Sequence, residues 1–354
     1  MRGLRSVSAI LLIAALSGVS CTLDPAALAV ADTFFQGPNS RVDAVFVVDD
    51  SNSMEALQSS LAAAVPGFIA ELDAAGVEYR IGVATTDMND PDRRGRLVNG
   101  AIAAWDQPTA AATLAAAVQP GIMGSQLERG LASAWAAVTP PLSTHENEGL
   151  RRPDARLAVV IVSDEDDCSD DGELPSSDPS ACAQFQGDLV PVGEYAARFR
   201  SMVEDDVDVS VHALVETGVS GPLEGCGGLN VGTRYVRLAR LLGGMVAPHC
   251  DDMTASMSEL ALQVAGRRSA FPLTRTPDPL TISVVVAESV QPVGDDDDSA
   301  PPPGENEVSP DEALVGASVS EDLTRENGWT YDAESNTVRI WGEALPGLGD
   351  AVQI

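Results

Sequence analysis

The chain contains no lysine and only three histidines, so every basic residue is an arginine. The absence of lysine excludes chemistry that needs a lysine amine, including P-loop nucleotide binding, Schiff-base catalysis and pyridoxal phosphate enzymes. The 354 residues carry 53 acidic and 21 basic side chains, for a formal charge of -32. A chain with this balance has no basic stripe to neutralise a phosphate backbone, so we expect no nucleic-acid partner.

Apolar runs long enough to span a membrane are also missing. The stretch 9–16 is too short for a span but, following two arginines, is typical of the apolar part of a signal peptide, which we expect over 1–20. The residues up to Cys21 resemble a bacterial lipobox, with Gly18 where leucine is usual. We therefore expect lipidation of Cys21 and a lipidated tether over 21–41 that anchors an exported protein in the cell envelope, at the outer membrane. Ordinary cleavage that leaves Cys21 unmodified is the alternative.

Cysteine is scarce, with only four residues beyond Cys21. An even set in an exported chain favours two disulfides, for which three connectivities are possible. We expect sequential pairing, Cys168–Cys182 and Cys226–Cys250, because it closes two local loops. A zinc site is the alternative, but the spacing contains no C-x-x-C pair.

Buried strand patterns alternate with helical patterns over most of the chain. Strands are expected at 44–48, 79–85, 157–162, 207–215 and 243–247, and helices at 54–75, 110–118, 125–138, 194–203, 233–242 and 253–264. This alternation predicts an α/β domain with a doubly wound, mostly parallel, Rossmann-like sheet over 42–266. A small hairpin is expected within 91–106, because Asn99-Gly100 is a strong turn signal.

The pattern changes after Arg268, where strands are expected at 281–286, 329–331 and 337–341 without an intervening helix. This indicates a small C-terminal all-β module over 270–354, with Trp329 and Trp341 in its core. An acidic and proline-rich insertion at about 292–312 includes four consecutive aspartates and is expected to be disordered. We interpret those aspartates as a solvated spacer, with calcium binding as the alternative.

Three oxygen-bearing side chains lie between the first buried strand and the first helix: Asp49, Ser51 and Ser53. In open α/β sheets this is the edge where ligands bind. Carboxylate and hydroxyl oxygens at alternating positions of a tight turn can converge on one hard cation.

Asp49-x-Ser51-x-Ser53 in this setting resembles the metal-ion-dependent adhesion site of von Willebrand factor type A domains, and the resemblance covers residues 42–266. The family has a threonine before a later helix, where this chain has Ser125, and an aspartate after the next long strand, where it has Asp164. The resemblance implies that these five residues bind Mg²⁺, or Mn²⁺ or Ca²⁺, with a coordination position left open for a carboxylate of a partner protein. The resemblance implies a non-enzymatic, adhesion-type protein, and the expected lipidation of Cys21 would make it a lipoprotein.

Other interpretations are open at this stage. The protein could be a structural envelope component with a vestigial metal site, in which Asp49 caps the helix. An aspartyl-phosphatase-like hydrolase is disfavoured, because Ser51 stands where that class has its second aspartate and lysine is absent. The histidines His145, His212 and His249 are scattered and lie beside no plausible nucleophile.

A second acidic stretch, 167–172, has calcium-loop spacing but lacks the final glutamate. We interpret it as an acidic loop closed by the Cys168–Cys182 disulfide, with calcium binding as the alternative.

Overall fold

The computed structural model describes residues 32–35, 41–172, 174, 180–203, 209–218, 231–267, 270–287, 319–323, 328–333, 336–340, 346–347 and 350–354. The expected signal peptide, Cys21, Cys226, Trp341 and the acidic insertion at about 292–312 lie outside these residues. None of the helices in the described ranges is long and apolar enough to cross a bilayer.

Six strands form the central sheet, in the order β4-β3-β2-β5-β6-β7. They are β2 (Arg41–Val48), β3 (Glu78–Thr85), β4 (Ile102–Ala104), β5 (Arg156–Ser163), β6 (Val209–Val215) and β7 (Val246–Pro248). All neighbouring strands run parallel except β4, which is antiparallel to β3. The predicted α/β class with a mostly parallel sheet is therefore confirmed. Because the strands are parallel, β2, β3, β5 and β6 end at one common edge.

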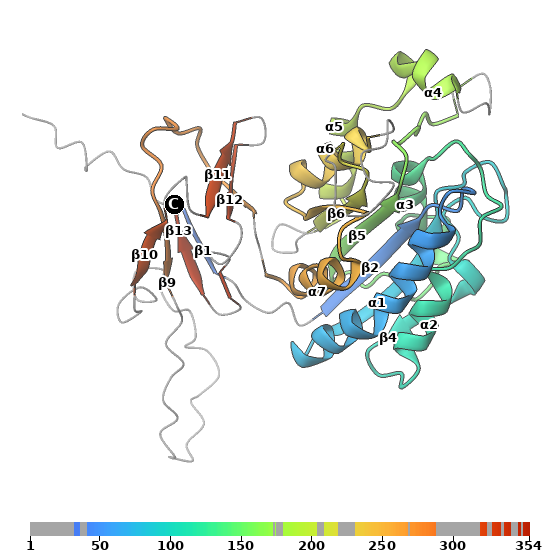
Figure 1. Cartoon of the computed structure of the whole chain (residues 1–354), viewed down its shortest axis with the longest axis horizontal. Coiled ribbons are helices and arrows are strands. Elements are labelled where there is room, and N and C mark those ends of the chain that lie inside the picture. Colours follow the sequence, from blue (N-terminus) through green and yellow to red (C-terminus); the bar gives the residue numbers. More distant parts are fainter. Residues whose placement is uncertain are drawn as a thin grey trace, which may run out of the picture. The chain divides into compact units, whose positions relative to one another are not determined.

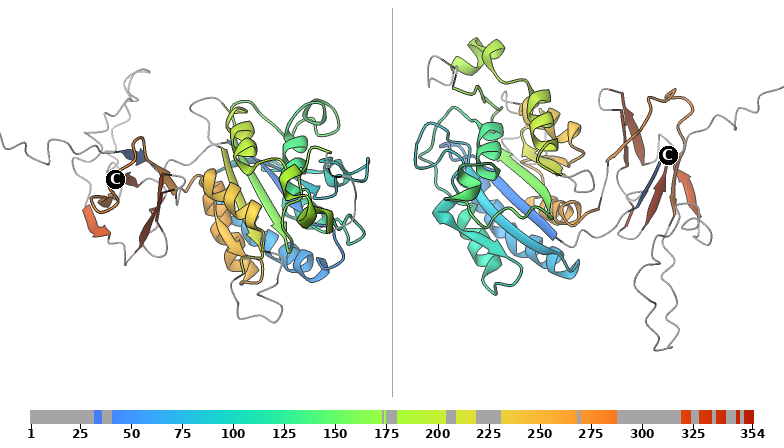
Figure 2. Two further views of the ribbon diagram at one scale, coloured as in Figure 1. Left: turned by 90° about the horizontal axis from the view of Figure 1, so that it is seen from above. Right: turned by 180° about the vertical axis from the view of Figure 1, so that it is seen from behind.

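Helices cover both faces of this sheet (Figures 1 and 2). One face packs against α1 (Glu55–Ala74), α2 (Ala110–Ala117) and α7 (Met253–Val264), and the other against α3 (Gly130–Val138), α5 (Val192–Arg200) and α6 (Thr233–Leu241). Alternate residues of β2 point to opposite faces, so Phe46 and Val48 join one core cluster while Val45 and Val47 join the other. Each such buried side chain contributes about 1.5–3 kcal/mol of transfer free energy, so β2 stabilises the packing on both faces of the sheet.

The hairpin predicted within 91–106 is wrong. Residues 98–100 form a short 3₁₀ turn and β4 pairs with β3 instead. Asn99 and Gly100 do adopt the left-handed conformation that the turn signal indicated. The segment before the turn has another partner, because the Leu97 amide donates to the side chain of Asn147 at 3.0 Å. Short helical segments also occur at 142–144, 180–184 and 186–188.

The C-terminal region contains two antiparallel sheets. One has the order β1-β13-β9-β10 and the other β11-β12-β8. Their strands are β1 (Thr33–Phe35), β8 (Ala270–Pro272), β9 (Val284–Ala287), β10 (Val319–Leu323), β11 (Trp329–Asp332), β12 (Thr337–Ile340) and β13 (Ala351–Gln353). The prediction of a plain tether over 21–41 is corrected here, because Thr33–Phe35 pairs with β13. Trp329 is buried in the shared core, as predicted.

Candidate metal site

The carboxylate of Asp49 lies at the edge where β2 and β5 end, and it is fully buried. The Asp49 amide donates to the carbonyl of Val162 on β5, at 2.9 Å, which joins the two strand ends. The Asp49 carboxylate accepts a hydrogen bond from the Ser51 amide at 2.8 Å and another from the Ser163 hydroxyl at 2.7 Å. These contacts fix one carboxylate oxygen pair at the centre of the edge.

Three further oxygens form a row beside Asp49. The Ser51 and Ser53 hydroxyls are 3.1 Å apart, and the Ser53 hydroxyl donates to Asp164 Oδ1 at 3.2 Å. Ser51 is buried, whereas Ser53 is exposed, so the row runs from the interior to the surface. Four of the five sequence-predicted residues are therefore brought together at one edge.

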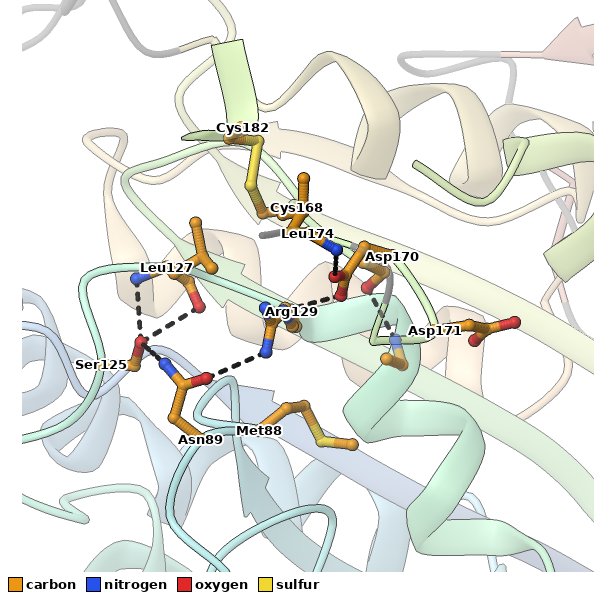
Figure 3. Close-up of polar contacts among 12 residues, drawn as sticks. Met88, Asn89, Ser125, Leu127, Arg129, Cys168, Asp170, Asp171, Leu174 and Cys182 are labelled. Atoms are coloured by element: carbon orange, nitrogen blue, oxygen red, sulfur yellow. Dashed lines mark hydrogen bonds and ion pairs between the residues drawn. A yellow bond between two sulfur atoms is a disulfide. The ribbon is translucent and has the colours of Figure 1, made fainter. Parts of the chain in front are cut away.

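Ser125, the fifth predicted residue, lies on the adjacent loop. The neighbouring Gly124 amide donates to the carbonyl of Asp50 at 2.8 Å, which places the two loops side by side. The Ser125 hydroxyl accepts hydrogen bonds from Asn89 Nδ2 at 2.8 Å and from the Leu127 amide at 3.0 Å (Figure 3). Among the described residues it makes no hydrogen bond to the other four predicted ligands.

The prediction of a helix over 125–138 is corrected at its start, because α3 begins only at Gly130. Its first amides are bound by side chains from distant segments instead of by a local cap. The Gly130 amide donates to the Tyr235 hydroxyl at 3.2 Å, Leu131 to Asp167 at 3.0 Å, and Ala132 to Ser169 at 2.9 Å. Because these partners satisfy the free helix N-terminus, residues 125–129 are released to form the site loop.

Two polar side chains that sequence reasoning missed hold the loops together. Gln58 on α1 donates from Nε2 both to the Asp49 carbonyl and to the Gly121 carbonyl, each at 2.8 Å. Asn89, on the loop after β3, contacts Ser125. Gln58 is a polar residue followed by two serines within the helix, and this local pattern gave no signal that the side chain would be buried.

Glu128 is a further carboxyl group that was missed. It is buried beside Thr86, whose hydroxyl donates to Glu128 Oε2, while its Oε1 is buried without a hydrogen-bond partner among the described residues. Burial first, and then the charge of Asp49, raise the pKa of Glu128 to about 10. Glu128 lies near Asp49 because residues 125–129 form a loop. The sequence pattern placed these residues in a helix and so did not predict this proximity.

Negative charge concentrates at this edge. Burial raises the pKa of Asp49, and the nearby Asp164 charge adds to the effect. Burial, together with the charges of Asp49 and Asp164, raises the pKa of Glu165 to about 7. Among the ion pairs of the described residues, none involves any of these carboxylates. The neighbouring arginines are used elsewhere, since Arg93 pairs with Asp50 and Arg129 pairs with Asp170.

The acidic stretch 167–172 is occupied by protein groups. Cys168 and Cys182 form the predicted disulfide. Asp167 accepts hydrogen bonds from Ser169 and Arg234, while Asp170 binds Arg129 and the Leu174 amide. These carboxylates are neutralised by arginines and capped by amides, which favours the acidic-loop interpretation over calcium. Cys250 is disulfide-bonded as well, and its expected partner Cys226 lies outside the described residues.

The donors at the β2–β5 edge suit a hard divalent cation. Asp49 and Asp164 supply carboxylates, and Ser51, Ser53 and Ser125 supply hydroxyls, which are the oxygen ligands that Mg²⁺ takes. No group of three or more His, Cys, Asp or Glu is arranged to hold a metal ion in the described part of the chain. A metal here would therefore depend on the serine hydroxyls as much as on the carboxylates.

No family model matches the chain, and no curated protein matches it. Among solved structures, the chain is similar to the pilus adhesin SpaC from Lactobacillus rhamnosus GG in its open conformation. The identity is 12% and the TM-score 0.39, over 91% of this chain and 40% of that one. It is also similar to proximal thread matrix protein 1 from the mussel byssus, with 10% identity and a TM-score of 0.36, over 65% and 49% of the two chains. The chain thus spans less than half the length of both structures.

Proposed function

We propose that the chain is a cell-envelope lipoprotein whose α/β domain is of the von Willebrand factor type A kind and binds a partner protein through a divalent cation. Asp49, Ser51, Ser53, Ser125 and Asp164 would hold Mg²⁺, or Mn²⁺ or Ca²⁺. The cation would supply an open coordination position that accepts a carboxylate of the partner. Cys21 would carry the lipid anchor, and no catalytic group is assigned.

The row of oxygens from buried Asp49 through Ser51 and Ser53 to Asp164 carries this proposal. Hydroxyl groups bind a hard cation without adding negative charge to the site. Among the five proposed ligands, the charge that attracts the cation therefore comes from Asp49 and Asp164 alone. The carboxylates of Asp49 and Asp164 add support, because a bound cation would offset the burial and the mutual repulsion that raise the pKa values of Asp49 and Glu165.

A bound cation would also reduce the electrostatic repulsion between this acidic surface and a partner's carboxylate. The chain carries a formal charge of -32, and an acidic partner would be repelled by it. A metal with an exchangeable ligand would let a carboxylate approach at one point of this surface.

The binding mode is tested with Mn²⁺, whose effect on water proton relaxation reports the water molecules that it retains. We expect the full chain to enhance relaxation on binding Mn²⁺, and we expect acetate or an acidic peptide to reduce the enhancement by displacing a water. Ser53→Ala should weaken binding of the metal. Ser60→Ala is the matched control, because the Ser60 hydroxyl donates only to the Ala56 carbonyl within α1. If Mn²⁺ binds but acetate and the acidic peptide leave its relaxation enhancement unchanged, the proposed partner mechanism is contradicted.

A further inference from the structure

The Ser125 hydroxyl is saturated by protein contacts. A hydroxyl has one hydrogen and two lone pairs. Asn89 Nδ2 and the Leu127 amide take both lone pairs, at 2.8 and 3.0 Å, and the hydrogen points to the Leu127 carbonyl at 3.4 Å. A serine that binds a metal must offer a lone pair. Ser125 therefore has to lose one of these two donors before it can become a ligand.

Asn89 cannot turn its carbonyl oxygen toward Ser125 without losing another contact. Arg129 Nη1 donates to Asn89 Oδ1 at 3.0 Å, and a guanidinium carries only donors (Figure 3). This contact requires the amide oxygen to face Arg129, so the NH₂ group faces Ser125. Arg129 is itself held by Asp170, with 2.9 Å between Nε and Oδ1, and both side chains are largely buried.

The backbone of Asn89 is also fixed. Its amide donates to Asp87 Oδ1 at 2.8 Å, and its carbonyl accepts from Arg94 Nη2 at 3.2 Å. The side chain of Asn89 is nevertheless exposed, whereas the Leu127 contact lies within the Ser125 loop itself. Of the two donors, Asn89 is the one that can be released by a small movement between two surface loops.

We propose that Asn89 acts as a latch on the metal site: oriented by Arg129 and Asp170, its NH₂ group occupies the Ser125 lone pair that a divalent cation would need. This inference rests on the proposed function and adds a regulatory residue to it. Metal binding and the Asn89–Ser125 hydrogen bond are competitors. The Arg129–Asp170 pair and the disulfide-closed loop that bears Asp170 set the strength of the latch.

The test is a Mn²⁺ titration of the full chain, with free Mn²⁺ followed by electron paramagnetic resonance. Asn89→Ala should bind Mn²⁺ about two- to fivefold more tightly, which corresponds to one exposed competing hydrogen bond. The same variant should unfold at a slightly lower temperature in EDTA, because it loses contacts to Ser125 and Arg129. A residue that merely supported the loop would weaken both properties. Gln126→Ala, which removes an exposed amide next to Ser125, is the control and should change neither.

A second comparison isolates the pair. In a Ser125→Ala background the Asn89→Ala substitution should leave Mn²⁺ affinity unchanged, because the competing lone pair is gone. The latch is overturned if Asn89→Ala binds Mn²⁺ equally or more weakly, or if its effect persists without the Ser125 hydroxyl. In that case, Asp49-dependent Mn²⁺ binding by the unaltered chain would still support the proposed function. Absence of Mn²⁺ binding by both the unaltered chain and Asn89→Ala overturns the two together.

Discussion

Single carboxyl groups at the β2–β5 edge behave unlike ordinary surface acids. Glu128 shows this most clearly, because burial and the Asp49 charge hold its pKa near 10. With this pKa we expect Glu128 to be protonated at neutral pH in the metal-free protein, where it accepts the Thr86 hydroxyl.

This protonation makes stability depend on pH. The unfolded chain releases the Glu128 proton near the ordinary glutamate pKa of 4.5, whereas in the folded chain the pKa of Glu128 is raised to about 10. The stability contribution is complete below the unfolded pKa and is lost as the pH rises toward the folded one. In EDTA, one such group lowers the unfolding free energy by up to about 1.4 kcal/mol per pH unit in that window.

Glu128→Gln should remove this dependence, because an amide of the same shape does not titrate and its oxygen can still accept the Thr86 hydroxyl. We expect the variant to gain stability over the unaltered chain progressively from pH 5 to pH 8, as measured by urea unfolding in EDTA. Glu146→Gln is the control, since Glu146 forms a surface ion pair with Arg96. Parallel pH profiles for Glu128→Gln and the unaltered chain would show that Glu128 is ionised.

Asp49, Ser51, Ser53 and Asp164 could be predicted from the sequence because they lie on the loops that follow two buried strands, and parallel strands bring their ends to one edge. The sequence did not predict Asn89, Gln58 or Glu128. Their roles depend on how the loops face one another, and no local pattern encodes that arrangement. Ser125 was expected at the start of a helix but lies on the loop before α3, and its engagement with Asn89 follows from the three-dimensional structure alone.

Among the elements, the loops after β2 and before α3 are packed without spare room. Gly124 marks the closest approach, since a Cβ atom there would lie 2.2 Å from the Asp50 carboxyl group. Asp50 cannot move aside easily, because it is fully buried and paired with Arg93. The glycine is therefore required by its neighbour and not by its own backbone conformation.

Gly124→Ala should lower the unfolding free energy by about 1–3 kcal/mol, the range for overpacking, and should weaken metal binding by separating the two loops. Gly67→Ala is the matched control and has the opposite expected sign. Gly67 lies within α1 with nothing within 4 Å of an added Cβ, so alanine should stabilise by about 0.5–1 kcal/mol. Urea unfolding measures both. Equal stability of Gly124→Ala and the unaltered chain would mean that the loops are not packed as described.

Elements with strong periodicity were predicted closely. The final helix of the α/β domain was expected over 253–264 and is Met253–Val264. The start of α3 was missed by five residues, because its amides are capped by Tyr235, Asp167 and Ser169 from distant segments. The hairpin at 91–106 failed for a similar reason, since Asn147 binds the segment that would have paired. Strand β1 was missed because three residues carry too little pattern.

At the scale of the whole molecule, the excess of acidic residues attracts cations non-specifically, and this attraction must be distinguished from binding at a specific site. A chain with a formal charge of -32 attracts cations everywhere, and this diffuse atmosphere is screened within about 10 Å at 0.1 M salt. A specific site differs by its dependence on single side chains. Removing one of 53 acidic residues hardly changes the atmosphere but would remove the central ligand of the site.

The most direct test compares thermal unfolding of the full chain in Mg²⁺ and in EDTA at matched ionic strength. A cation that binds only the folded state stabilises it by about 2.7 kcal/mol at one hundred times its dissociation constant, which corresponds to a rise of several degrees for a domain of this size. We predict this rise for the unaltered chain and for Ser60→Ala, and no rise for Asp49→Ala. No stabilisation of the unaltered chain, or an equal rise in Asp49→Ala, would contradict the account.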